Sequence, residues 1–256
     1  MSRISDRLKN KKNFIGFLTA GDPCMDKTKE FVLEMVNAGA DLVEIGIPFS
    51  DPIAEGEVIQ NANVRALNAG ANLSKLFDCI VEIRKETDIP LVFLTYANPV
   101  FKYGYENFMK KCNEIGIDGL IIPDIPYEEK GEILDVAKKY DVDIISMIAP
   151  TSKERIQMIA KDSTGFLYVV SSLGVTGMRS NINTNLEEIV DSIRKVTDTP
   201  LCIGFGINNE EQAKHFSEFA DGVIVGSAIV KIIEKYGEDS GKHIYEYVEK
   251  MKKAVE

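Results

Sequence analysis

Short apolar runs alternate along the chain with longer segments whose apolar residues recur every three or four positions. The short runs are continuous and rich in Ile, Val, Leu and Phe, which is typical of strands buried on both faces of a parallel sheet. Eight strands are predicted, at Phe14–Thr19, Leu42–Ile47, Leu91–Thr95, Gly119–Ile122, Asp143–Ile148, Gly165–Val170, Leu201–Gly204 and Gly222–Val225.

The longer segments predict amphipathic helices in the gaps between these strands. The segment Lys27–Asn37, for example, places Phe31 and Met35 on one face, and Gly39 follows as a stop. The other predicted helices are Ser74–Glu86, Tyr105–Ile115, Glu128–Tyr140, Lys153–Ala160, Leu186–Val196, Glu210–Phe219, Ile229–Lys235 and Ile244–Ala254.

Eight β-then-α units within 256 residues predict an α/β fold, the (β/α)8 TIM barrel. We expect a single domain over residues 1–256, with extra helices at the N-terminus and the C-terminus, because no linker divides the chain. A doubly wound open sheet is the alternative, but it usually carries a nucleotide fingerprint after its first strand. Ala20-Gly21-Asp22-Pro23 stands there and does not match. In a barrel, catalytic side chains are expected where strands end and loops begin.

Charge and composition narrow the possible partners. The formal net charge is −10, which argues against nucleic acid and against docking on anionic membranes. No apolar run approaches the length of a membrane span, and residues 1–12 lack the apolar core of a secretory signal. The cysteines show no metal-ligand spacing, so we expect no metal site. We expect the cysteines to be reduced and to serve as packing residues in a cytoplasmic protein. They are Cys24, Cys79, Cys112 and Cys202.

Glu44 is a carboxylate inside an apolar, strand-like run, where burial of the ionised form is costly unless the charge is paired or used. Facing inward near a strand end, it should have a raised pKa and act as a general acid or base. The alternative is a structural Glu paired with a basic residue from elsewhere, since none occurs between Asp41 and Val64. Asp51 is as compatible with a turn cap as with a partner contact. Glu55, taken by itself as a loop residue, does not indicate a function.

Three glycine-bearing turns in the last third suggest a phosphate site. They are Gly174–Gly177, Gly204–Asn208 and Gly226–Ile229, and the last two follow the predicted seventh and eighth strands. Barrels often bind phosphate there through backbone N–H groups and a helix N-terminus. Neither of the last two turns contains Lys or Arg, so amides and hydroxyls, chiefly that of Ser227, would hold the anion. Tight strand-to-helix packing is the alternative explanation for the glycines.

The long polar segment 171–185 contains two glycines and is predicted to be a loop. Loops of this length inside compact domains are usually functional or disordered. A lid that closes over a phosphate substrate and excludes water is one interpretation, and a mobile surface loop is the other.

Several motifs together resemble those of the tryptophan synthase alpha subunit family. They are Glu44 with Ile47–Pro52, Ile59–Asn63, Gly174–Gly177, Gly204–Ile207 and Gly226–Lys231, in the family's order from Phe14 to Lys231. The resemblance implies a (β/α)8 barrel that cleaves indole-3-glycerol phosphate into indole and glyceraldehyde 3-phosphate by a retro-aldol reaction in tryptophan biosynthesis.

The resemblance also implies roles for individual residues. Glu44 would carry the proton transfers, and Glu55 would support charge on the indole N–H. Phosphate would rest on Gly177, Phe205, Gly206, Gly226 and Ser227. The indole pocket and lid would comprise Phe17, Ile59, Leu94, Tyr168 and Thr176, with Thr176 meeting Glu55 on closure.

The chain departs from the family pattern at three positions. Position 55 is usually Asp and here is Glu, so the carboxylate moves by about one C–C bond, a scale to which catalysis is sensitive. Glu57 replaces a usual Pro, and Ser172 stands where many relatives carry Arg.

The resemblance implies a partner, the beta subunit of an alpha2-beta2 complex, which holds pyridoxal phosphate and joins indole to serine. No cofactor is expected in this chain, and Asp51, Pro52 and 98–101 are the expected contact surface. Two other functions are weighed: a sugar-phosphate isomerase or epimerase, which leaves the Glu44 segment unexplained, and a non-catalytic subunit that only activates a beta partner.

Overall fold

Nine parallel strands form one continuous sheet in the computed structural model, which describes residues 2–150, 152–170, 181–204 and 206–256. Neighbouring strands follow the order β5-β4-β3-β2-β1-β9-β8-β7-β6. Their bounds are β1 Asn13–Thr19, β2 Leu42–Gly46, β3 Leu91–Leu94, β4 Gly119–Ile121, β5 Asp143–Ile144, β6 Ser146–Ile148, β7 Leu167–Val170, β8 Leu201–Gly204 and β9 Gly222–Val225.

The two ends of this sheet are joined by a single residue, Ile145. Strand β5 pairs with β4 and β6 pairs with β7, so the chain passes from one edge of the sheet to the other through Ile145. The Ile145 N–H still donates to the Leu120 carbonyl at 2.9 Å. The expected strand Asp143–Ile148 is therefore one bent strand in two pieces, and the bend closes an eight-unit barrel. The predicted TIM-barrel fold is confirmed.

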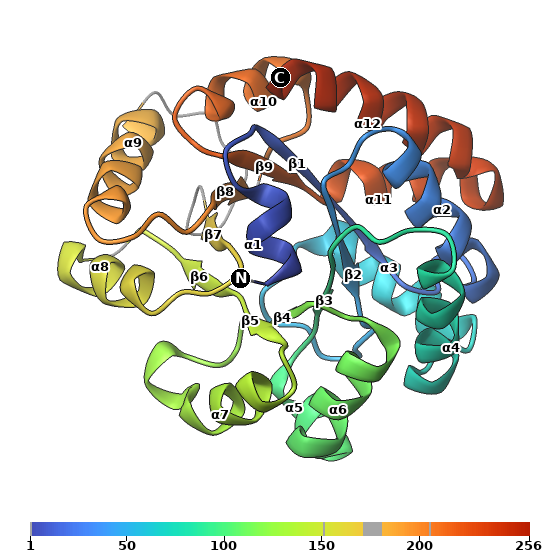
Figure 1. Ribbon diagram of the computed structural model, residues 1–256. Helices are drawn as coiled ribbons and strands as arrows, with labels where there is room; N and C mark the ends of the chain where they lie inside the picture. The colour runs from blue at the N-terminus through green and yellow to red at the C-terminus, as the bar shows by residue number, and fades with distance from the viewer. Residues whose placement is uncertain (1, 151, 171–180, 205) are drawn as a thin grey trace.

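The α-helices are α1 Arg3–Leu8, α2 Met25–Asn37, α3 Glu57–Asn68, α4 Leu73–Arg84, α5 Ala97–Tyr103, α6 Tyr105–Ile115, α7 Gly131–Lys139, α8 Lys153–Lys161, α9 Asn181–Arg194, α10 Glu210–Ser217, α11 Ser227–Tyr236 and α12 Gly241–Val255. Helices α2 to α12 surround the strands as an outer ring (Figure 1). In the part of the chain that the structure describes, no helix combines the length and the apolar character needed to cross a membrane.

Two helices were not predicted from the sequence, and one begins more than a turn earlier than expected. Helix α3 buries Ala62, Asn63 and Ala66, which are too small or too polar to give a strong apolar period. Helix α5 buries only Val100, so its periodicity is equally weak. Helix α9 begins at Asn181 rather than Leu186, which shortens the predicted loop 171–185; residues 171–180 lie outside the described residues.

Alternate residues of each strand face two different cores. Val43 and Ile45 belong to the large cluster between the barrel and its helices. Leu42 belongs to a second cluster, inside the barrel, which also contains the α1 residues Ile4 and Leu8, both fully buried. Helix α1 therefore plugs the amino end of the barrel, and in Figure 1 it lies across the centre of the ring. We infer one domain, because α1 packs on the inner core and α12 packs on the outer core of the same sheet.

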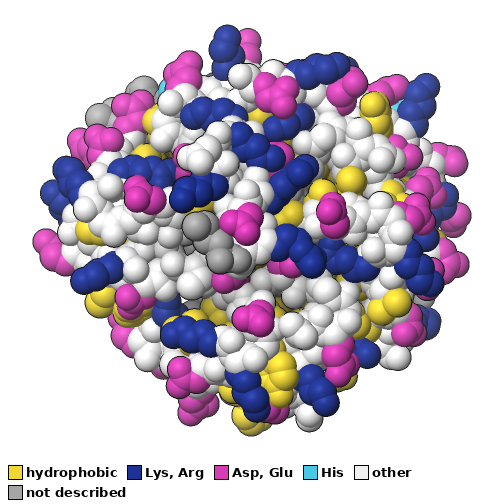
Figure 2. Space-filling model, in the orientation of Figure 1, with side chains coloured by type: hydrophobic (Ala, Val, Ile, Leu, Met, Phe, Trp, Pro, Cys, Tyr) yellow, Lys and Arg dark blue, Asp and Glu magenta, His cyan; other side chains and the backbone are white. Residues whose placement is uncertain are grey.

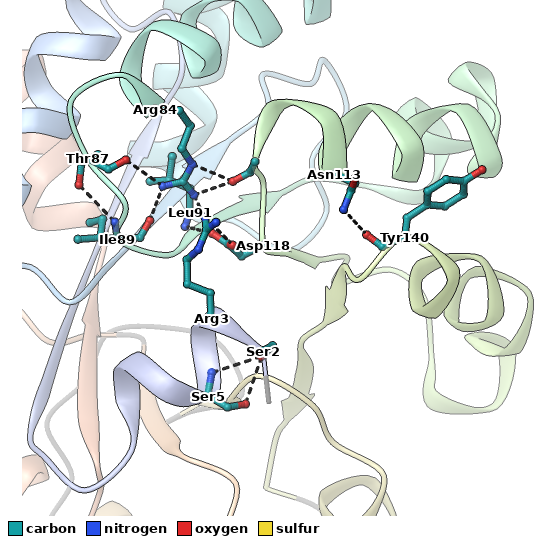
Figure 3. A network of polar contacts seen from close by, with 11 residues as sticks. Ser2, Arg3, Ser5, Arg84, Thr87, Ile89, Leu91, Asn113, Asp118 and Tyr140 are labelled. Carbon is teal, nitrogen blue, oxygen red and sulfur yellow. Dashed lines mark hydrogen bonds and ion pairs between the residues drawn. The ribbon is translucent and has the colours of Figure 1, made fainter.

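Asp118 ties the plug to the barrel (Figure 3). Its carboxylate pairs with Arg3 of α1 at 3.0 Å and with Arg84 of α4 at 2.7 Å, and it accepts the Leu91 N–H at 2.8 Å. Arg84 also donates to the Gly116 carbonyl. One carboxylate thus joins α1, α4 and the start of β3.

We expect Asp118→Ala to lower the free energy of unfolding by about 2–4 kcal/mol, because it strands a largely buried guanidinium and a buried backbone N–H. Urea denaturation measures this loss. Glu114→Ala is the matched control, since its pair with Lys110 is exposed and 3.9 Å long; it should cost less than about 1 kcal/mol. Equal losses in the two variants would contradict the assigned role of Asp118.

Candidate active site

Glu44 lies on the inner face of β2, opposite Phe17 of β1 and Val92 of β3. The side chain is 1% exposed, and among the described residues its Oε1 has no hydrogen-bond partner. Desolvation raises the pKa of Glu44 to about 8. Because no basic side chain offsets that shift, the alternative of a structural ion pair finds no support in the described residues. A carboxyl that titrates near neutral pH can both give and take a proton.

Three predicted pocket residues lie together in one apolar cluster. Phe17, Ile59 and Leu94 belong to this cluster, which is formed by β1, β3, α3 and α11. Glycine makes room for the Phe17 ring: a Cβ on Gly46 would come within 2.8 Å of its Cζ, and one on Gly226 within 3.1 Å of its Cδ1. The cluster thus offers one aromatic ring and several aliphatic side chains, which are suited to contact with an indole ring.

Tyr168 is inside the barrel on β7 and is 6% exposed. A Cβ on Gly204 would lie 2.4 Å from its hydroxyl oxygen, so the ring covers the end of β8. Burial raises the pKa of Tyr168, and the charge of Glu44 raises it further. The two side chains therefore share the interior of the barrel.

Glu55 lies between β2 and α3 and is held by Tyr96, for which no individual role was predicted. The Tyr96 hydroxyl donates to the Glu55 carboxylate and accepts the Ala54 N–H at 3.1 Å. Burial raises the pKa of Glu55, while the hydrogen bond from Tyr96 lowers it. One signal could have found Tyr96: it stands two residues beyond Leu94, on the loop that leaves β3 at the carboxyl end of the barrel.

Two of the predicted phosphate turns lie at the carboxyl ends of β8 and β9. Gly206 has φ +79°, and a Cβ at this position would meet no described atom within 4 Å, so its backbone is open to a ligand. Gly226 is the N-cap of α11, whose first residue is Ser227. A helix N-terminus with an exposed hydroxyl is suited to an anion. Phe205, Thr176 and Gly177 lie outside the described residues.

A basic hollow at the other end of the barrel is not part of this site. Its volume is about 380 Å³ and it is lined by Arg7, Lys11, Lys12, Gly39, Asp41, Lys252 and Glu256. Lys and Arg side chains are frequent on this face (Figure 2). Lys11 and Lys252 are engaged by the buried Asp41 at 2.6 and 2.9 Å, so these charges stabilise the fold where the terminal helices meet.

Comparison with known proteins gives one consistent family. The family model described as tryptophan synthase alpha chain matches residues 4–256. The tryptophan synthase alpha chain of Alkaliphilus metalliredigens is 47% identical over 98% of this chain and 97% of its own length. The subunit alpha structure from Legionella pneumophila has a TM-score of 0.91 at 35% identity and covers 100% of this chain and 98% of its own. A chain of the Pyrococcus furiosus tryptophan synthase a2b2 complex has a TM-score of 0.84 at 32% identity and covers 94% of this chain and 97% of its own length.

The raised pKa of Glu44 predicts a pH-dependent stability. Between its unfolded value of 4.5 and about 8, the folded protein binds one more proton than the unfolded chain, so stability falls as pH rises through this window. Glu44→Gln removes this effect. Relative to the wild type, the variant should gain a few kcal/mol between pH 5 and pH 8.5, since each pKa unit is worth about 1.4 kcal/mol. Urea unfolding of both proteins at both pH values measures the gain. If the free energies of unfolding of the wild type and the variant change in parallel with pH, the raised pKa of Glu44 is contradicted.

Proposed function

The chain belongs to the tryptophan synthase alpha chain family, and from this premise we propose how its own side chains cleave indole-3-glycerol phosphate. It is the lyase subunit that releases indole and glyceraldehyde 3-phosphate. The observation that carries the proposal is Glu44, a buried carboxyl with a pKa of about 8, facing the barrel interior beside Tyr168.

Glu44 supplies the proton transfers. The bond to be broken joins indole C3 to a carbon that bears a hydroxyl group, and a carbon leaving group needs an electron sink. Protonated Glu44 donates to C3, and the ring becomes iminium-like. The resulting carboxylate is then a base, so it removes the hydroxyl proton while the C–C bond breaks and an aldehyde forms. One proton enters and one leaves Glu44, and the residue returns to its starting state.

Glu55 stabilises the positive charge that develops on the indole ring. The charge of the protonated ring resides largely on N1, whose N–H becomes a stronger donor. A carboxylate that accepts this hydrogen bond acts mainly on the transition state. Glu55 follows the same strand as Glu44 and lies at the mouth of the barrel, near the apolar wall of Phe17, Ile59 and Leu94.

The phosphate is held at the opposite end of the substrate. Gly226 and Ser227 offer the N-terminus of α11, and Gly206 offers open backbone. Gly177 and Phe205 complete the set by resemblance, and Thr176 is expected to reach Glu55. The Phe17 ring packs directly against Gly226, so the apolar wall and the phosphate turn adjoin, as a substrate with indole and phosphate ends requires.

Indole passes to a tryptophan synthase beta subunit in an alpha2-beta2 complex. Pyridoxal phosphate belongs to that partner, and the chemistry proposed for this chain uses side chains alone. Ile53, which follows the expected contact residues Asp51 and Pro52, is 77% exposed, and Phe101, which belongs to the expected segment 98–101 and lies on α5, is 69% exposed. The proposed location is the cytoplasm, because a phosphorylated substrate is too costly to move through a bilayer and is consumed where it is made.

Glu44→Gln should abolish measurable indole release from indole-3-glycerol phosphate, with or without a beta subunit, because the amide neither donates nor accepts the required proton. A colorimetric indole assay measures this. Glu57→Gln is the control on the same segment, where Glu57 is exposed, and it should keep wild-type turnover. Activation of a beta subunit without any indole release by the wild type would instead favour a non-catalytic subunit.

Glu55→Ala should lower kcat about tenfold or more, because it removes a charge partner of the transition state. The same indole assay under substrate saturation measures kcat, and circular dichroism confirms that the variant is folded. An unchanged kcat would exclude the role given to Glu55.

A further inference from the structure

We propose that Tyr96 is a positioning residue for Glu55, and that its reach is matched to a Glu rather than an Asp at that position. This inference rests on the proposed role of Glu55 and deepens it. The Tyr96 hydroxyl donates to Glu55 Oε2 at the carboxyl end of the barrel. A carboxylate can accept several hydrogen bonds, so the bond from Tyr96 leaves acceptor capacity for an indole N–H.

The Tyr96 ring is fixed from several sides. It is 2% exposed and stacks on Phe49, with ring centroids 5.3 Å apart and planes at 30°. Its chain neighbours are also fixed: the Thr95 N–H donates to the Ile121 carbonyl at 3.0 Å, and the Ala97 N–H donates to the Asp124 carboxylate at 2.9 Å. A hydroxyl on such a ring can define the place of a more mobile carboxylate.

The direction of the Tyr96 hydroxyl proton is set by its second contact. The Ala54 N–H donates to the same oxygen at 3.1 Å, so the tyrosine accepts from the residue before Glu55 and donates to Glu55 itself. The Glu55 carbonyl accepts from the Gln60 side chain of α3 at 2.8 Å. The loop is therefore held on both sides of the catalytic carboxylate, by the barrel and by the helix that follows.

Tyr96 also counteracts two effects that favour protonation of Glu55. Burial raises the pKa of Glu55, and the nearby charge of Asp124 raises it as well. The hydrogen bond from Tyr96 acts in the opposite direction because it stabilises the ionised form. Since only the ionised form is a strong acceptor for the indole N–H, the tyrosine favours the working state of Glu55 against the larger effect of burial.

The length of the side chain matters because the backbone around it is pinned. An Asp at position 55 would withdraw the carboxylate by about one C–C bond, roughly 1.5 Å. A hydrogen bond at an ordinary O···O distance of about 2.7 Å would then be lost. The Ala54 and Gln60 contacts oppose a compensating movement of the loop. In this chain, Glu55→Asp should therefore reduce activity, although Asp is the residue expected from the family pattern.

The test compares Tyr96→Phe, Glu55→Asp and Glu55→Gln with the wild type in the indole assay. Tyr96→Phe keeps the stacked ring and removes only the hydroxyl. We expect kcat to fall about tenfold while KM changes less than about threefold, because the ring becomes charged only after the substrate has bound. The acid limb of the kcat profile should also move to higher pH. In a Glu55→Gln background, Tyr96→Phe should have little further effect.

Tyr140→Phe is the matched control. Its hydroxyl also donates to a carboxylate, that of Glu106, but the pair is exposed and lies between α6 and α7. This variant should keep the wild-type kcat and pH profile.

The outcomes separate the two proposals. If the wild type releases no indole, or Glu44→Gln still does, the proposed function fails. If those results are as expected but Glu55→Asp keeps wild-type kcat, or Tyr96→Phe lowers kcat equally at every pH, the positioning role of Tyr96 is overturned. If Tyr96→Phe does not fold, as circular dichroism would show, Glu55→Asp decides: a kcat at least about fivefold lower supports the inference, and a smaller loss overturns it.

Discussion

Closure of the sheet at Ile145 is the constraint on which the rest of the structure depends. A closed barrel has an inner face without access to bulk water, and α1 seals its amino end with Ile4 and Leu8. A carboxyl group on that face loses its hydration and gains no counter-charge from the described residues. Glu44 therefore titrates near neutral pH rather than near 4.5. The chemistry of one side chain is thus a property of the whole sheet.

Glycine contributes to this site because it has no side chain. Gly46 and Gly226 make room for the Phe17 ring, and Gly204 makes room for Tyr168. Two of the turns that were interpreted as a backbone cradle for phosphate therefore admit the aromatic rings of Phe17 and Tyr168. Tight packing, one of the two alternatives at the level of sequence, is observed at Gly204 and Gly226, and phosphate binding by these turns stays a proposal.

The sequence predicted those features that depend on local pattern. Continuous apolar runs identified the strands, and a carboxylate within such a run identified Glu44; the family resemblance then supplied the roles of Glu55 and the pocket residues. Features set by distant contacts were missed. The first N–H of α5 is capped by Asp124, 27 residues away, and Tyr96 meets Glu55 across 41 residues. The local pattern of apolar residues does not indicate such long-range pairs. The bend at Ile145 exists only because the sheet must close.

Helix α1 makes the two ends of the barrel different, because it fills only the amino end. Ile4 and Leu8 fill the amino end with apolar side chains, so we expect substrate and product to pass through the carboxyl end. Indole is small and uncharged, and it would leave an open tube from either end. With the amino end filled, we expect indole to leave at the carboxyl end, on the side where Ile53 and Phe101 expose apolar surface. A short helix at one end of the barrel would thereby give product transfer one direction.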